Sequence, residues 1–173
     1  MRQLGLALLF GLLTTSGGSR CRAQDRSTES HVTVEVVPGR DGTVQITDRG
    51  RIVTVPRMAS QTGIEGVQVA ADGRTAGWLA DFKDPDSENP YAGGLVIWRG
   101  GRVIRVFHSE QSFYSWSFNE NATLVAYHTG PRHGEAIPHC ELHDIKTGRQ
   151  VAQWDGDLDD PIARPSWAAH LPR

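Results

Sequence analysis

The sequence is poor in cysteine and lacks the compositional marks of several protein classes. It has 2 Cys among 173 residues, too few for a disulfide-rich scaffold. The 18 Lys and Arg do not outnumber the 20 Asp and Glu, so the basic excess of a nucleic-acid-binding domain is missing. A hydrophobic content of 38% is too high for a disordered chain. We therefore expect one folded domain that does not bind nucleic acid.

Linear catalytic motifs are also missing from the sequence. It contains no G-x-S-x-G nucleophile elbow, no phosphate-binding loop, no H-E-x-x-H and no G-x-G-x-x-G between a strand and a helix. Carboxylates that meet only in the folded chain leave no such trace, so an enzyme stays open as an alternative. The sequence predicts no cofactor.

The one long apolar run lies at the N-terminus. Residues 4–13, LGLALLFGLL, follow Arg2 and are about half as long as the roughly 20 residues of a membrane helix. Small side chains at Cys21 and Ala23 suit the −3 and −1 positions of a cleavage site. The pattern predicts a secretory signal peptide over 1–23, no membrane span, and a secreted or periplasmic protein.

Cleavage after residue 23 changes the composition of the remaining chain. It removes three arginines, which shifts the formal net charge from −2 to −5. It also removes Cys21 and leaves Cys140 without a partner for an intrachain disulfide. We expect a flexible segment over 24–30 and a folded domain over 31–173 that is stabilised by packing alone.

The folded part repeats itself with a period of roughly 50 residues. One type of segment has a Gly-Arg pair between two apolar runs and occurs at ITDRGRIVTV (46–55), IWRGGRVIRV (97–106) and DIKTGRQVAQ (144–153). A second type, VQVAADGRTAGW (67–78), aligns with WSFNENATLVAY (116–127), and SWAAH (166–170) begins a third copy. Each segment alternates as a hairpin does, so every unit has four short antiparallel strands and the fold class is all-β.

The last full repeat resembles those of TolB-type and tryptophan-aspartate-repeat-like β-propellers. In WSFNENATLVAY a Trp-Ser pair opens the first strand, and in LHDIKTGRQV (142–151) an Asp precedes Thr-Gly in the outer hairpin turn. The resemblance covers most of residues 44–170, although Val67 replaces the Trp in the preceding repeat. It implies propeller-type blades, which serve as binding scaffolds or as gating domains attached to peptidases, and it implies no catalytic residue.

Counting the strands gives about three sheets. Two full repeats cover 64–107 and 113–154, and three strands precede them at 32–37, 43–47 and 51–55. A single strand around Trp167 follows them and is expected to complete the first sheet. Three arrangements stay open: an incomplete ring, a homodimer that exchanges this strand to build six sheets, and a fragment of a longer propeller.

Two long polar loops are the candidate binding surface. They cover 81–93 and 128–139, and their equivalent positions in adjacent units place them side by side at one end. The candidate ligand-binding residues are Asp84, Glu88, Tyr91, Arg132, His133 and Glu135. We therefore expect an exported, non-enzymatic binding or interaction module for a protein or a small extracytoplasmic ligand.

A metal-assisted hydrolase is the alternative, because His128, His133, His139 and His143 lie close together in the sequence. On a strand, however, His139 and His143 share a face about 13 Å apart, while Cys140 points to the other face. The sequence therefore predicts no metal site. The acidic segment 154–161 is expected to be a solvated connection, and the five Trp are expected to pack between sheets.

Overall fold

The computed structural model describes residues 32–36, 42–133, 138–160 and 162–171. The predicted signal peptide (1–23) and the segment 24–30 lie outside these residues. The described chain forms eleven β-strands and one short 3-10 helix, and no α-helix. The predicted all-β fold class is confirmed. None of the helical structure in the described part of the chain is long and apolar enough to cross a membrane.

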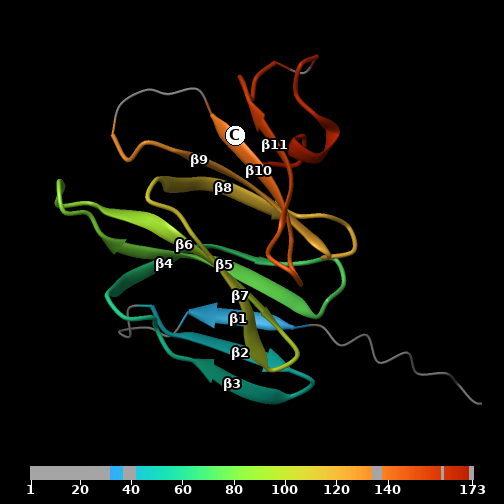
Figure 1. The fold of residues 1–173 in the computed structure, drawn as a ribbon. Coiled ribbons are helices and arrows are strands. Elements are labelled where there is room, and N and C mark those ends of the chain that lie inside the picture. The colour runs from blue at the N-terminus through green and yellow to red at the C-terminus, as the bar shows by residue number, and fades with distance from the viewer. Residues whose placement is uncertain (1–31, 37–41, 134–137, 161, 172–173) are drawn as a thin grey trace, which may run out of the picture.

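The strands form three antiparallel sheets in which neighbours follow one another along the chain (Figure 1). The first sheet contains β1 (Thr33–Val36), β2 (Val44–Asp48) and β3 (Arg51–Val55). The second sheet contains β4 (Gln61–Val69), β5 (Thr75–Lys83), β6 (Pro90–Arg99) and β7 (Arg102–His108). The third sheet contains β8 (Ser112–Phe118), β9 (Leu124–Gly130), β10 (His139–Asp144) and β11 (Gln150–Asp155).

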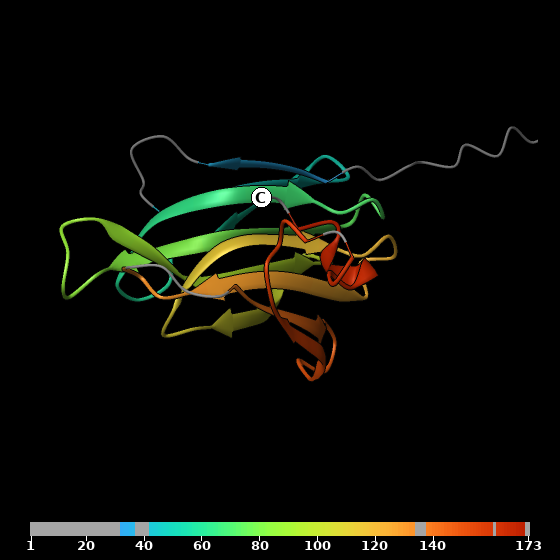
Figure 2. The same cartoon turned by 90° about the horizontal axis from the view of Figure 1, so that it is seen from above.

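The sheets stack face to face in chain order, and the second sheet lies in the middle (Figure 2). Trp78 and Leu79 are neighbours on β5, and they point to opposite faces because strand side chains alternate. Trp78 packs toward the first sheet with Val44 and Ile46, and Leu79 packs toward the third sheet. A strand that is covered on both faces needs apolar side chains at successive positions. This explains why β5 and β6 have continuous apolar runs.

The Trp residues predicted to pack between sheets do so at three positions. Trp78 and Trp98 are buried between the first and second sheets, and Trp116 is buried between the second and third. Trp154 and Trp167 are half-buried on the outer face of the third sheet. The repeat therefore locates the large side chains of both cores.

The two end faces of the stack differ in how they avoid exposing apolar surface. The first sheet turns Val44 and Ile46 inward, and its outward positions on the same strands include Glu35, Gln45 and Thr47. The third sheet instead has an apolar outer face, and residues 156–160 and 162–171 cover it. The largest exception on the first sheet is Ile52, which is 63% exposed.

The strand expected around Trp167 is wrong. Residues Ser166–Ala168 form the 3-10 helix η1, which packs on β9 and β10 of its own third sheet rather than beside β1. Trp167 nevertheless packs against the buried cluster that contains Ala126, the position that corresponds in the repeat to Gly77 beneath Trp116. The first sheet keeps three strands, and the segment predicted for strand exchange is engaged within its own chain.

Arg164 explains why this segment is not extended. Its guanidinium donates hydrogen bonds to the backbone carbonyls of Leu158 (3.0 Å), Leu171 (2.9 Å) and Ala168 (2.8 Å from Nε). Convergence of three carbonyls on one side chain requires a curled backbone. Ala168 and Leu171 are buried at a spacing of three, which suits 3-10 geometry.

The two candidate loops are shorter than expected. Strand β5 continues to Lys83 and β6 begins at Pro90, so the connection between them is 84–89. Likewise β9 continues to Gly130 and β10 begins at His139. The ends of these strands have polar residues because the hairpins extend beyond the edge of the core. There, neither face of the strand is covered by another sheet, so apolar side chains are not needed.

Candidate functional site

Asp84 lies at the centre of the predicted loop surface. Its side chain is 2% exposed, and its Oδ1 accepts a hydrogen bond from the backbone amide of Asp86 (3.0 Å), which turns the chain after β5. Arg132 Nη1 lies 3.1 Å from Oδ1, and His133 Nε2 lies 3.0 Å from Oδ2. The amide of Asp86, and then the charges of Arg132 and His133, hold the pKa of Asp84 below its ordinary value.

Tyr91 completes this group. The guanidinium carbon of Arg132 lies 4.8 Å from the centroid of the Tyr91 ring, within the range of a cation–π contact. Asp84 and Tyr91 lie in the β5–β6 hairpin of the second sheet, whereas Arg132 and His133 follow β9 of the third, so the contacts join the two sheets. We call these four residues the loop clamp.

The structure thus brings four of the six predicted ligand-binding residues together. Glu88 is exposed in the 84–89 connection, and Glu135 lies outside the described residues. Both oxygens of Asp84 are occupied within the clamp. The predicted ligand role of these residues stays a prediction, because the contacts that join them are contacts with one another.

A second polar group runs along β10 on the face that points toward the second sheet. His139 Nδ1 lies 2.5 Å from Asp155 Oδ1, and its Nε2 lies 2.9 Å from Glu141 Oε1. The other oxygen of Glu141 lies 2.5 Å from His143 Nε2 and accepts from the Tyr127 hydroxyl at 2.6 Å. These residues form a continuous chain of alternating imidazoles and carboxylates.

The charges of this chain shift the pKa values of its members. The hydrogen bond to Asp155 raises the pKa of His139 above its ordinary value. Burial by itself would raise the pKa of Glu141, but hydrogen bonds from Tyr127, His143 and His139 outweigh it and lower that pKa. Both shifts therefore favour the charged forms of these groups.

The side chains along β10 alternate between the two faces of the strand. Glu141 lies between His139 and His143, and Cys140 points to the opposite face, into the core under residues 156–171. Among the residues that the structure describes, no group of three or more His, Cys, Asp or Glu side chains could hold a metal ion.

The acidic segment predicted over 154–161 makes turns in its described part, 154–160. Asp157 Oδ1 accepts the amide of Asp159 (2.8 Å), and Asp160 Oδ1 accepts the amides of Ile162 (2.9 Å) and Ala163 (3.1 Å). These carboxylates therefore bind the backbone of their own connection, as expected for a structured link between β11 and η1.

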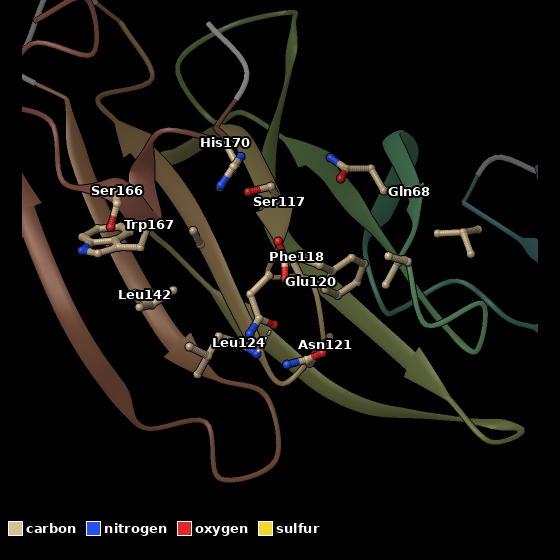
Figure 3. Close-up of a pocket in the computed structure, with 15 residues that line it drawn as sticks. Gln68, Ser117, Phe118, Glu120, Asn121, Leu124, Leu142, Ser166, Trp167 and His170 are labelled. Carbon is tan, nitrogen blue, oxygen red and sulfur yellow. Dashed lines mark hydrogen bonds between the residues drawn. The ribbon is translucent and has the colours of Figure 1, made fainter. Parts of the chain in front are cut away.

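A groove of about 560 Å³ lies at the meeting point of three segments that are distant in sequence (Figure 3). The end of β4 and its turn (68–71) form one wall, the end of β8 and the β8–β9 turn (117–121) form the floor, and the η1 segment (166–170) forms the other wall. Trp167 lies on one side of the groove and Gln68 on the other, with Ser117, Phe118 and Glu120 between them (Figure 3).

Local contacts fix the floor and one wall of the groove. Asn119 Oδ1 accepts the amides of Thr123 and Leu124, both at 2.9 Å, and so shapes the β8–β9 turn. The Phe118 ring lies edge-on to Trp116, with centroids 5.0 Å apart. Gln68 Nε2 donates to the Trp116 carbonyl at 2.8 Å. The groove is therefore built on the same contacts that join the second and third sheets.

The groove was not found by sequence reasoning. Taken separately, the segments that line it indicate a polar hairpin turn and a packing tryptophan. The sequence feature that could have revealed the groove is the equivalence of 67–78, 116–127 and 166–170. It indicates that the ends of these segments come together, and the third copy is shorter than the other two.

Comparison with known proteins gives a likeness in structure. No protein-family model matches the chain, and no curated protein matches it in sequence. The solved structure of Kuenenia stuttgartiensis hydrazine synthase matches 73% of this chain with a TM-score of 0.46 and 21% sequence identity. The chain corresponds to 39% of the length of that protein.

Proposed function

We propose that this chain is an exported binding module and that the groove in Figure 3 is its ligand site. The observation that carries the proposal is the size and lining of the groove. A volume of about 560 Å³ falls within the roughly 300–1,000 Å³ of small-molecule sites. Two aromatic side chains from separate segments, Phe118 and Trp167, line it together with aliphatic and polar side chains, and small-molecule sites combine these kinds of side chain.

The lining indicates the chemistry of the ligand. Glu120 and His170 are its ionisable side chains, and the other polar side chains are amides and hydroxyls such as those of Gln68, Asn121 and Ser166. Neutral hydrogen-bonding groups beside aromatic faces suit a small polar ligand that has one flat apolar face. We therefore propose a small, largely uncharged extracytoplasmic ligand.

The wider setting of the proposal rests on the sequence. Export is supported by the signal-peptide pattern of residues 1–23. A propeller-type blade is supported by the antiparallel order of the four strands in the second and third sheets and by the roughly 50-residue period. Loops and turns on such a rigid scaffold are where binding residues concentrate.

The loop clamp is a second candidate for the ligand site. The Arg132 side chain keeps 27% of its surface exposed and the His133 side chain keeps 58%, although both are held by Asp84. Their outward N–H groups could donate to an acceptor on a ligand without moving. If the clamp is the site, replacing Tyr91, Arg132 and His133 with Ala abolishes binding.

The test is a ligand screen followed by matched variants. Purified protein is screened by thermal shift against dipeptides, monosaccharides and nucleosides, and each hit is titrated against three variants. We expect Phe118→Ala to weaken the hit about tenfold or more, because it removes a large part of the apolar contact area. Val67→Ala is the control, since Val67 is exposed on β4 but does not line the groove. If Phe118→Ala leaves the affinity for a hit unchanged and the Tyr91, Arg132 and His133 to Ala variant abolishes its binding, the ligand site is the loop clamp and not the groove.

A further inference from the structure

Turns with the sequence Gly-Arg lie at the end of the stack opposite the loop clamp (Figure 1). Their arginines are Arg51, Arg74, Arg102 and Arg149. The preceding glycines have φ values of +76°, +61°, +88° and +74°, so a glycine in the left-handed conformation precedes the arginine in each of these turns. Because the repeat sets the position of each turn, it also gathers these cations at one end.

Two further arginines join the second and third sheets at this end. Arg105 donates from Nε to the Ile145 carbonyl (3.2 Å) and from Nη2 to the Lys146 carbonyl (2.5 Å). Arg99 donates from Nε to the Thr75 hydroxyl (2.6 Å) and from Nη2 to the Ala122 carbonyl. The four acceptors are neutral oxygens, so these bonds fix the guanidinium groups without adding a negative charge beside them.

Between these turns lies a cleft of about 360 Å³, which we call the cationic cleft. Its lining residues are Arg99, Arg102, Val103, Ile104, Ile145 and Lys146. None of these described residues is acidic. Arg102 and Lys146 are exposed at its rim, whereas Ile145 is buried and Ile104 is half-buried. The cleft thus has an apolar floor beneath a positively charged rim.

The nearby acids are occupied by their own turns. Asp72 accepts the Thr75 hydroxyl (2.7 Å) and amide (2.9 Å) and lies 3.5 Å from Arg99 Nη2. Asp144 accepts the amide (2.6 Å) and hydroxyl (2.7 Å) of Thr147. These bonds lower the pKa of Asp144, so its charge is satisfied within the turn.

We propose that the cationic cleft binds a small organic anion, namely a phosphate or carboxylate group joined to an apolar portion. Arg102 and Lys146 contact the anionic group, since guanidinium and ammonium groups are the side chains that bind phosphate and carboxylate. The apolar portion packs on Val103 and Ile104. This site is separate from the groove, and the proposal does not depend on the function assigned to the groove.

The experiment is a titration followed by ¹H–¹⁵N spectra at physiological ionic strength, where distant charges are screened. The probes are phenyl phosphate and benzoate, which distinguish the two anionic groups, and benzyl alcohol, which is uncharged. We expect at least one of the two anions to shift the amide signals of Val103, Ile104 and Ile145, and benzyl alcohol to leave them in place.

Two double variants with the same change in net charge distinguish binding in the cationic cleft from a general attraction of anions to the positive charge at this end of the stack. Arg102→Gln with Lys146→Gln removes the rim and is expected to weaken binding about tenfold or more. Arg51→Gln with Arg74→Gln removes two exposed arginines of the same end that do not line the cleft, and it is expected to leave the affinity within about twofold. Equal losses in both variants, or no shift with either anion, would overturn the proposal.

Discussion

The indole nitrogen of Trp116 donates a hydrogen bond to the carbonyl oxygen of Gly66, 3.0 Å away and 50 residues earlier in the chain. The bond crosses from the third sheet to the second and fixes how one sheet lies on the next. It also accounts for a glycine in β5, because a Cβ atom on Gly77 would lie 2.7 Å from the Trp116 ring. The roughly 50-residue period of the sequence therefore corresponds to a contact between adjacent sheets.

Trp116 and Trp98 provide a matched pair to test this contact. Both are buried, but Trp98 Nε1 has no hydrogen-bond partner among the described residues. We expect Trp116→Phe to lower the free energy of unfolding by about 1 kcal/mol more than Trp98→Phe does, because the first variant loses a hydrogen bond and the second does not. Urea denaturation measures both values. Equal losses would mean that the bond to Gly66 does not stabilise the stack.

Arg164 is predicted to keep residues 156–171 on the outer face of the third sheet. Cys140 is fully buried beneath them, and burial raises the pKa of its thiol to about 11. In a Cys21→Ser background, we expect Arg164→Ala to raise the rate at which Cys140 reacts with a disulfide reagent by about tenfold or more, because the loss of three carbonyl contacts favours local opening.

The control for this experiment is Arg149→Ala, which removes an exposed arginine of the β10–β11 turn. Loss of the Arg164 charge by itself would raise the pKa of Cys140 and slow the reaction, so a faster reaction reports opening. An unchanged rate in Arg164→Ala would show that the apolar contacts hold the segment without the arginine.

His139 is predicted to give stability that depends on pH. Its pKa is raised in the folded state above the ordinary value of 6.5, so its contribution is complete below that value and is lost as the pH rises through the folded pKa. The difference in stability between the native protein and His139→Gln should therefore be largest on the acidic side of 6.5 and shrink above it. Urea denaturation across the pH range measures this difference.

His108→Gln is the control for the pH experiment, because His108 is exposed at the end of β7. Its stability difference should not follow the same curve. The opposite sign applies to Glu141, whose lowered pKa gives a contribution that is present above 4.5 and lost as the pH falls through the folded pKa. A difference for His139→Gln that grows with pH would contradict the assigned hydrogen bonds.

Asp84 is predicted to matter for stability even if the clamp binds no ligand. Asp84→Asn removes the charge that Arg132 and His133 share, so we expect a lower melting temperature. Asp86→Asn removes a neighbouring exposed carboxylate and should leave the melting temperature unchanged. Differential scanning calorimetry compares the two. Identical melting temperatures would show that the loop clamp does not contribute to the stability of the fold.

Most of the fold could be predicted because short apolar or alternating runs, bounded by turn residues, recur along the chain with a period of roughly 50 residues. The conformation around Trp167 could not be predicted, because it depends on which carbonyl oxygens the Arg164 guanidinium binds. The pattern of apolar and polar residues does not specify those hydrogen bonds. Trp167 therefore packs against the outer face of its own third sheet from a 3-10 helix, and not as a strand of the first sheet as the sequence predicts.

The candidate sites show the same division. The loop clamp could be anticipated because equivalent loops of adjacent sheets emerge together, which brought Asp84 and Arg132 within 3.1 Å. The groove depends on three segments meeting at one place, and the walls are single turns whose sequences, taken alone, are ordinary. Residues 68–71 and 166–170 become neighbours of the same floor only once the sheets have stacked.

The most direct test of the binding proposal is a ¹H–¹⁵N spectrum of the protein saturated with a hit from the ligand screen. We predict that the indole signal of Trp167 and the amide signals of Phe118 and His170 shift together, while those of Tyr91 and Arg132 stay in place. Shifts confined to Tyr91 and Arg132, with Trp167 unchanged, would contradict the groove as the ligand site.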